Sequence, residues 1–93
     1  MKLPWFRFWP ADYLQDTLGL SRCDHGSYLL LILAYWLNEG PLSDDDGKLR
    51  RICLCDRDEW PAVRKTLASF FDIRNGSWHH KRIDAELAEA KQR

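Results

Sequence analysis

The chain contains one stretch, residues 28–37, in which nearly every position is apolar. A helix with apolar side chains on all sides has to be enclosed by other elements, so this stretch predicts the central buried helix. Ser21 and Asp24 precede it with the spacing of a capping box, and Gly40-Pro41 follows it as a typical helix end. The stretch has about half of the roughly 20 residues that a membrane span needs, so we expect no membrane partner.

Two further helices are predicted in the middle of the chain. The acidic residues at 44–46 favour the positive N-terminus of a helix that runs from Asp44 to about Cys53. The next helix has the clearest apolar stripe, with side chains at helical spacing. The stripe consists of Trp60, Val63, Leu67, Phe70 and Phe71. Asp58 is the predicted N-cap, because it places Pro61 in the first turn, where a missing N–H is harmless.

The dipeptide Asn75-Gly76 lies between apolar positions and is a strong signal for a β-hairpin. A two-residue turn there puts Ile73 opposite Trp78, and it puts Phe71 opposite His80, on one face of the hairpin. The side chains on the other face are Arg74, Ser77, His79 and Lys81. A last helix is predicted from about Asp84, polar enough to lie on the surface.

Four aromatic residues surround one arginine in the sequence WFRFW at positions 5–9. The segment is short and is stopped by Pro10, which predicts a strand, and a short helix over residues 11–16 follows. We expect the strand to pair with the hairpin and its aromatic rings to pack on the central helix, because small domains need large buried areas. A base-stacking platform and a partner surface are the alternatives. The candidate interface residues are Trp5, Phe6, Phe8 and Trp9.

The predicted order of elements indicates a known layout. Two helices joined by a short turn and followed by a β-hairpin form a winged helix-turn-helix. We therefore predict a single domain over residues 1–93, mainly α with a small β-sheet, in which the N-terminal strand pairs with the C-terminal wing. A length of 93 residues and an apolar fraction of 45% fit one small domain.

The charges are balanced over the whole chain but not along it. Residues 1–46 carry three bases and seven acids, whereas residues 47–82 carry nine bases and four acids. The overall balance argues against indiscriminate binding to nucleic acid, so the basic middle segment is the predicted place for phosphate contacts. The three cysteines show no disulfide spacing, and no cleavable signal sequence is visible. We expect reduced thiols in a cytoplasmic protein.

A metal site is a weaker interpretation of the cysteines and histidines. Cys53 and Cys55 are separated by one residue, which is too few for a typical zinc knuckle. His79 and His80 are neighbours on a predicted strand, so their side chains point to opposite faces. We therefore expect no metal and no cofactor.

Asp12, Asp16 and Asp24, with His25 as a base, are the candidates for a catalytic set. No glycine-rich phosphate loop or nucleophile motif accompanies them, so we expect structural roles and a protein that is not an enzyme. Arg82 is predicted to share the inward face of the hairpin strand, where it needs an acidic partner such as Asp12 or Asp16. Arg82→Ala is then expected to lower the melting temperature strongly.

A set of landmarks runs through nearly the whole chain. They are Pro10-x-Asp12-Tyr13-Leu14, Asp16-Thr17, Leu20-Ser21, Gly26-x-Tyr28, Tyr35-Trp36, Gly40-Pro41-Leu42-x-Asp44-Asp45, Glu59-Trp60, Phe70-Phe71 and Asn75-Gly76-x-Trp78-x-His80-x-Arg82-x-Asp84-x-Glu86-Leu87. In these the chain resembles the YdaU-like prophage proteins, a domain of unknown function found near phage replication genes. The resemblance implies a winged-helix domain similar to the N-terminal domains of phage and plasmid replication initiators. Many relatives continue into a long polar, basic tail, so this chain is expected to be a short stand-alone member or a piece of a longer protein.

The first functional hypothesis is DNA binding in replication initiation or its control. The last helix of a winged-helix motif enters the major groove, and the wing contacts phosphate or the minor groove. The candidate DNA-binding residues are Lys48, Arg50, Arg51, Arg57, Arg64, Lys65, Arg74, His79 and Lys81. Asp58 and Glu59 count against this hypothesis, because they would repel phosphate at the start of the helix.

The second hypothesis is a small phage-encoded protein-interaction module. It would act as an adaptor or inhibitor that docks on a host replication or defence protein. The neutral net charge and the aromatic N-terminal segment favour this alternative. A homodimer is a further expected partner arrangement, since pairing would strengthen the binding of a single neutral module.

Overall fold

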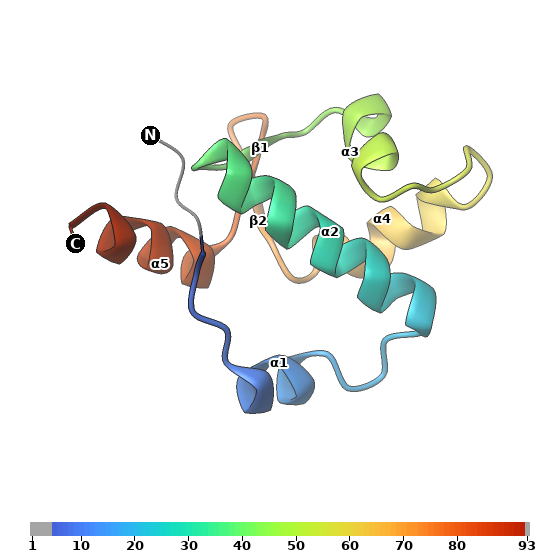
Figure 1. Cartoon of the computed structure of the whole chain (residues 1–93). Coiled ribbons are helices and arrows are strands. Elements are labelled where there is room, and N and C mark those ends of the chain that lie inside the picture. Colours follow the sequence, from blue (N-terminus) through green and yellow to red (C-terminus); the bar gives the residue numbers. More distant parts are fainter. Residues whose placement is uncertain (1–4, 93) are drawn as a thin grey trace.

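The computed structural model describes residues 5–92 of the chain (Figure 1). Within this part the chain forms five helices and three short strands. They are α1 (Pro10–Asp16), α2 (Arg22–Asn38), β1 (Leu42–Ser43), α3 (Asp46–Ile52), α4 (Trp60–Ala68), β2 (Asp72–Arg74), β3 (Ser77–His79) and α5 (Lys81–Gln92). The prediction of a mainly α protein with a small β-sheet is therefore confirmed.

The predicted central helix is α2, which packs against α3, α4 and α5 (Figure 1). The Ser21 hydroxyl caps this helix by accepting a hydrogen bond from the backbone N–H of Asp24, as the capping-box spacing predicts. Leu31 and Tyr35 on its inner face are completely buried. At the C-terminal end, Glu39 adopts the left-handed conformation with a φ of 56° and ends the helix one residue before the expected glycine.

One face of α2 is not enclosed, contrary to the prediction of a helix buried on all sides. Leu29, Leu33 and Leu37 follow one another at intervals of four residues and are exposed. A domain of this size has few elements with which to cover a central helix. The neighbouring helices and β1 therefore cover the inner face of α2 and leave this stripe in solvent.

The sheet is antiparallel and has the strand order β1-β3-β2. The predicted hairpin is confirmed, since Ile73 pairs with Trp78 and the turn lies at Asn75-Gly76. Asn75 and Gly76 have φ values of 52° and 72°, the left-handed values that a tight two-residue turn requires. The third strand is β1, in which Leu42 lies opposite Trp78.

Residues 5–9 form no strand, so the predicted pairing of the N-terminal segment with the wing is wrong. The strand that pairs with β3 on the side away from β2 is β1. The segment instead contacts the helices through its side chains. The ring centroids of Phe6 and Trp36 lie 5.0 Å apart, and Arg7 Nε donates to Glu86 Oε1 at 3.0 Å. Packing of this segment on the central helix is thus confirmed for Phe6.

The helices α3 and α4 begin at other residues than the sequence predicted. α3 begins at Asp46, because the Asp45 carboxylate caps it by accepting a hydrogen bond from the N–H of Lys48. α4 has Glu59 at its N-cap position without a side-chain cap, so the assignment of Asp58 as the cap is wrong. A regular turn over residues 57–59 leads directly into α4 and displaces the start of the helix.

α5 begins at Lys81, three residues before the predicted start at Asp84. It lies against α2 and buries Ile83 and Leu87, so it is amphipathic rather than a helix of the surface alone. The order α2–β1–α3–α4–β2–β3 is consistent with the predicted winged helix-turn-helix. No helix between residues 5 and 92 has the length and the apolar character that crossing a membrane requires.

Candidate functional site

Arg64, a predicted phosphate contact on α4, has several partners within the domain. Its Nη1 donates to Asp44 Oδ1 at 2.8 Å and to Asp46 Oδ1 at 3.0 Å. Its guanidinium also lies over the ring of Trp78, 5.3 Å from the centroid. The hydrogen bonds from Arg64 and from the Trp78 indole hold the pKa of the Asp44 carboxyl below its usual range. Arg64 therefore ties α4 to the segment before α3 and to the wing.

The other predicted DNA contacts fall into two groups. Arg50 Nη1 donates to the carbonyl of Cys55 at 3.0 Å, and Arg74 Nε pairs with Asp72 Oδ2 at 2.7 Å on the exposed wing. Within residues 5–92, five exposed candidates form no ion pair. They are Lys48, Arg51, Arg57, Lys65 and Lys81. His79 is half-buried on β3.

The predicted pairing of Arg82 with an N-terminal acid is confirmed, but its predicted inward orientation is wrong. Arg82 Nη2 lies 3.0 Å from Asp12 Oδ2, and the two side chains are 49% and 50% exposed. Because α5 already begins at Lys81, Arg82 lies in the first turn of a helix and not on the inward face of a strand. The ion pair therefore links α1 to the start of α5 at the surface.

His80 points inward as predicted and connects α2 with the start of α5. Its Nδ1 accepts a hydrogen bond from the N–H of Ile83 at 3.3 Å, so the neutral ring carries its proton on Nε2, which donates to the Tyr28 hydroxyl at 2.9 Å. The Tyr35 hydroxyl accepts from the His80 N–H at 3.0 Å and donates to Asp84 Oδ1 at 2.5 Å. Burial lowers the pKa of His80 and raises the pKa of Tyr28 and of Tyr35 to about 12.

The cysteines have ordinary structural surroundings. Cys53 and Cys55 are buried free thiols, and Cys23 is an exposed one. Burial raises the pKa of Cys53 to about 12, which keeps this thiol protonated and unreactive at neutral pH. In the described part of the chain, no three histidine, cysteine or acidic side chains are grouped so that they could hold a metal ion.

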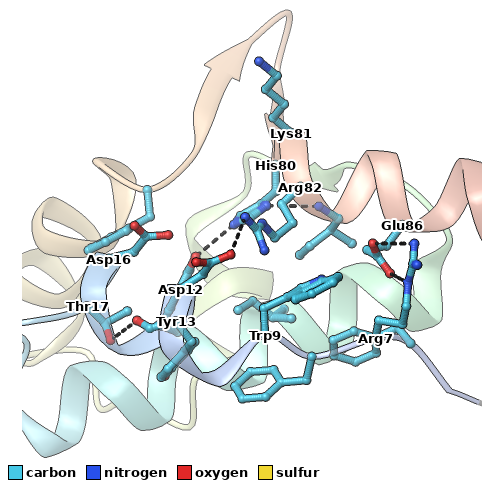
Figure 2. Close-up of a pocket in the computed structure, with 16 residues that line it drawn as sticks. Arg7, Trp9, Asp12, Tyr13, Asp16, Thr17, His80, Lys81, Arg82 and Glu86 are labelled. Atoms are coloured by element: carbon cyan, nitrogen blue, oxygen red, sulfur yellow. Dashed lines mark hydrogen bonds and ion pairs between the residues drawn. The ribbon is translucent and has the colours of Figure 1, made fainter.

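A pocket of about 380 Å³ lies between the N-terminal segment, α1, α2 and the start of α5 (Figure 2). Its aromatic wall consists of Phe6, Phe8, Trp9, Tyr13, Tyr28 and Phe70. Three acids and three bases also line it, namely Asp12, Asp16, Glu86, Arg7, Lys81 and Arg82. The sequence indicated the aromatic segment but not the pocket, because the walls come from distant parts of the chain. The density of aromatic residues between positions 5 and 13 is the signal that pointed closest to it.

The four candidate interface residues do not alternate between two faces as a strand would. Trp5, Phe8 and Trp9 are 55%, 50% and 47% exposed, whereas Phe6 is half-buried against α2. Phe8 also contacts Tyr13, with ring centroids 5.3 Å apart. Three large aromatic side chains in one short segment thus remain accessible to a partner.

Residues 4–88 match a family described as a protein of unknown function, DUF1376. The chain belongs to this family. It is also 35% identical over 91 residues to the uncharacterized protein YdaU of Escherichia coli (strain K12), an alignment that covers 98% of this chain and 31% of the relative. The chain therefore spans 31% of the length of that relative. No solved structure matches it. The predicted membership in a YdaU-like family is confirmed.

Proposed function

We propose that this domain binds duplex DNA through α4 and the β2–β3 wing, without catalysing a reaction, in the initiation or control of phage or prophage replication. The observation that carries the proposal is the order α2–β1–α3–α4–β2–β3 around the sheet β1-β3-β2. In a winged helix this order makes α4 the element that enters the major groove and β2–β3 the wing. A fold does not give a function by itself, so side chains have to supply the contact.

The accessible basic side chains favour a contact with phosphate. Lys48, Arg51, Arg57 and Lys65 are exposed and have no acidic partner within residues 5–92. They come from α3, from the connection that follows it and from α4, which are successive elements of the proposed DNA-binding motif. We assign phosphate contacts to these four residues first, since Arg64 already has two acidic partners.

A salt titration of binding to a short random-sequence DNA duplex tests this proposal. Fluorescence anisotropy is expected to show an affinity that falls steeply as salt increases, because bound phosphates release counterions. The double variant Arg57→Ala, Lys65→Ala removes two of the proposed contacts. It should weaken binding and reduce the slope of log K against log salt by roughly 2.

Arg22→Ala provides the control, because Arg22 is an exposed base at the start of α2, away from α3, α4 and the wing in the sequence. Its slope should equal that of the unchanged protein. Absence of binding at low salt contradicts the proposal. A loss of slope by roughly 1 in the control variant, half of that expected for the double variant, also contradicts it, since the contact would then be an unspecific effect of net charge.

The accessible aromatic side chains favour a second candidate function, the recognition of a host or phage protein. Trp5, Phe8 and Trp9 are each about half exposed in one short segment. Aromatic residues are enriched at the energetic centres of protein interfaces, where they bury large areas. A module that docks on another protein through residues 5–9 uses a surface different from α4 and the wing.

Site-specific photocrosslinking tests this second function. A photoreactive amino acid replaces Trp5, and in a control protein it replaces Leu54, which is 80% exposed and lies between α3 and α4. An adduct formed at position 5 only, with a protein that binds the purified domain less tightly after Phe8→Ala, supports the function. Equal adducts at both positions, or an affinity that Phe8→Ala leaves unchanged, contradict it.

A further inference from the structure

The aromatic pocket contains a carboxylate that has no partner. Asp16, at the C-terminal end of α1, makes no hydrogen bond or ion pair within residues 5–92. Figure 2 shows its side chain directed toward the space beside His80. It acts electrostatically on both Tyr28 and His80 across the pocket. An unpaired acid beside aromatic rings points to a ligand that brings positive charge.

The basic side chains around the pocket do not neutralise Asp16. Arg82 pairs with Asp12 at 3.0 Å. Arg7 pairs with Glu86 and with Glu89 on α5. Lys81 extends away from the other lining side chains in Figure 2. The exposed Asp16 carboxylate is therefore left without a basic partner among residues 5–92.

The ring arrangement suits a flat cation. The rings of Tyr13 and Tyr28 are nearly parallel, with centroids 6.0 Å apart and planes at 17°. Phe8 lies against Tyr13, and Trp9 adds a further exposed ring to the lining. A guanidinium group is planar, stacks on aromatic faces and binds a carboxylate through two parallel N–H donors. A lysine ammonium has no plane to stack and is more strongly hydrated.

We propose that this pocket accepts an arginine side chain of a partner polypeptide, with the guanidinium paired to Asp16 and stacked on the aromatic lining. The pocket volume of about 380 Å³ lies in the range of small-ligand sites and leaves room for such a side chain. The inference rests on the second candidate function, protein recognition through the N-terminal segment. It does not depend on DNA binding, because no residue of α3 or α4 lines the pocket.

The test uses the full chain and three peptides in an NMR titration. The peptide acetyl-Gly-Arg-Gly-Arg-Gly-amide is compared with the same peptide carrying citrulline, a neutral side chain of almost the same shape, and with the lysine version. Saturable shifts are expected at the amides of Tyr13, Asp16 and Thr17 and at the Trp9 indole, all of which line the pocket. The arginine peptide should bind at least roughly fivefold more tightly than either of the others.

Two variants connect the binding to the pocket. Asp16→Asn keeps the size of the side chain and is expected to lower the affinity for the arginine peptide at least roughly fivefold. Asp58→Asn removes an exposed acid in the connection before α4 and should leave the affinity unchanged. Phe8→Leu removes an aromatic ring from the lining. It should lower the affinity for the arginine peptide more than the affinity for the citrulline peptide.

Several outcomes overturn the proposal. They are equal affinities for arginine and citrulline peptides, equal affinities for arginine and lysine peptides, and an affinity that Asp16→Asn does not change. Shifts confined to residues outside the pocket also overturn it. The peptide titration measures binding at the pocket alone, whereas photocrosslinking detects contact between the N-terminal segment and a partner protein. A failure of one experiment is therefore distinguishable from a failure of the other.

Discussion

His80 shows how one half-buried side chain organises a junction between elements. Its unprotonated Nδ1 accepts the N–H of Ile83 in the first turn of α5, where a helix has no internal acceptor for that donor. Its Nε2–H reaches the Tyr28 hydroxyl on α2. The neutral imidazole thus satisfies a helix end and a buried hydroxyl at once. A protonated ring would lose the first of these bonds.

Protonation of His80 is therefore expected to destabilise the protein. Burial lowers its pKa in the folded state below 6.5, so the unfolded chain takes up the proton first as the pH falls. The contribution of His80 to the free energy of unfolding is full above pH 6.5 and declines below that value, toward the folded pKa. Urea unfolding between pH 7 and pH 5 measures this decline. His80→Asn removes the titrating group and should lose less stability over the same interval, whereas equal losses would contradict the prediction.

Arg64 and Arg82 are expected to contribute different amounts to the free energy of unfolding. Arg82 makes one ion pair between half-exposed partners, and such pairs contribute about 0–1 kcal/mol. Arg64 is less exposed, bonds two carboxylates and covers the Trp78 ring. Urea unfolding should show that Arg64→Ala lowers the free energy of unfolding by about 1–3 kcal/mol, and that Arg82→Ala lowers it by less than about 1 kcal/mol. A larger cost for Arg82→Ala would restore the inward role that the sequence suggested.

At the scale of elements, a few carboxylates near α3 hold the wing and α4 together. Asp44, just after β1, accepts from Arg64 and from the Trp78 indole. Asp46, at the start of α3, accepts from Arg64 and from the Trp60 indole. The sequence indicated acidic residues that favour a helix N-terminus, and they do flank α3. Their second use, as acceptors for side chains of α4 and β3, follows from positions that are distant in the sequence.

The wing turn depends on a conformation that glycine adopts easily. Gly76 has a φ of 72°, and a Cβ at this position would meet no atom within 4 Å. Gly76→Ala should therefore cost roughly 1 kcal/mol, all of it from the backbone conformation. Gly26→Ala is the matched control, because Gly26 lies inside α2 and is equally open. It should stabilise the protein by about 0.5–1 kcal/mol in the same urea unfolding experiment. The same sign for both changes would contradict this account of the turn.

At the scale of the whole molecule, the N-terminal part is attached by few side chains. α1 buries none of its residues, whereas α2 and α4 bury several. The attachments include Phe6 against Trp36, Arg7 with Glu86, Asp12 with Arg82, and Tyr13 against His25 and Tyr28 of α2. These contacts form the pocket, and their small number predicts that this part of the domain opens at low energetic cost.

Hydrogen exchange measures this opening. Amides of α1 should exchange faster than those of α2 and α4, because local opening of α1 exposes little apolar surface. Phe6→Ala removes the ring that lies against Trp36 and should speed exchange in α1 further, with α4 unchanged. Equal protection of α1 and α2 would show instead that the N-terminal part unfolds only together with the core.

Short-range signals in the sequence were the reliable ones. The Ser21 cap and the Asn75-Gly76 turn were predicted correctly, because a few neighbouring residues decide them. The start of α4 was missed, since the turn before it competes with the Asp58 cap. The N-terminal strand was missed because β1, and not residues 5–9, pairs with β3, while Phe6 and Arg7 contact the helices through their side chains. No local pattern records which of two segments pairs with β3.

The sequence by itself determined the helical class of this protein, its hairpin, its central helix and its family, since these follow from periodicity, turn chemistry and landmark residues. The tertiary structure alone decided which charges have partners. It engaged Arg64, left Asp16 unpaired and assembled a pocket from the N-terminal segment, α1, α2 and α5. The physical reason is that charge pairing and cavities depend on distances between residues remote in the chain, and no pattern within one segment encodes those distances.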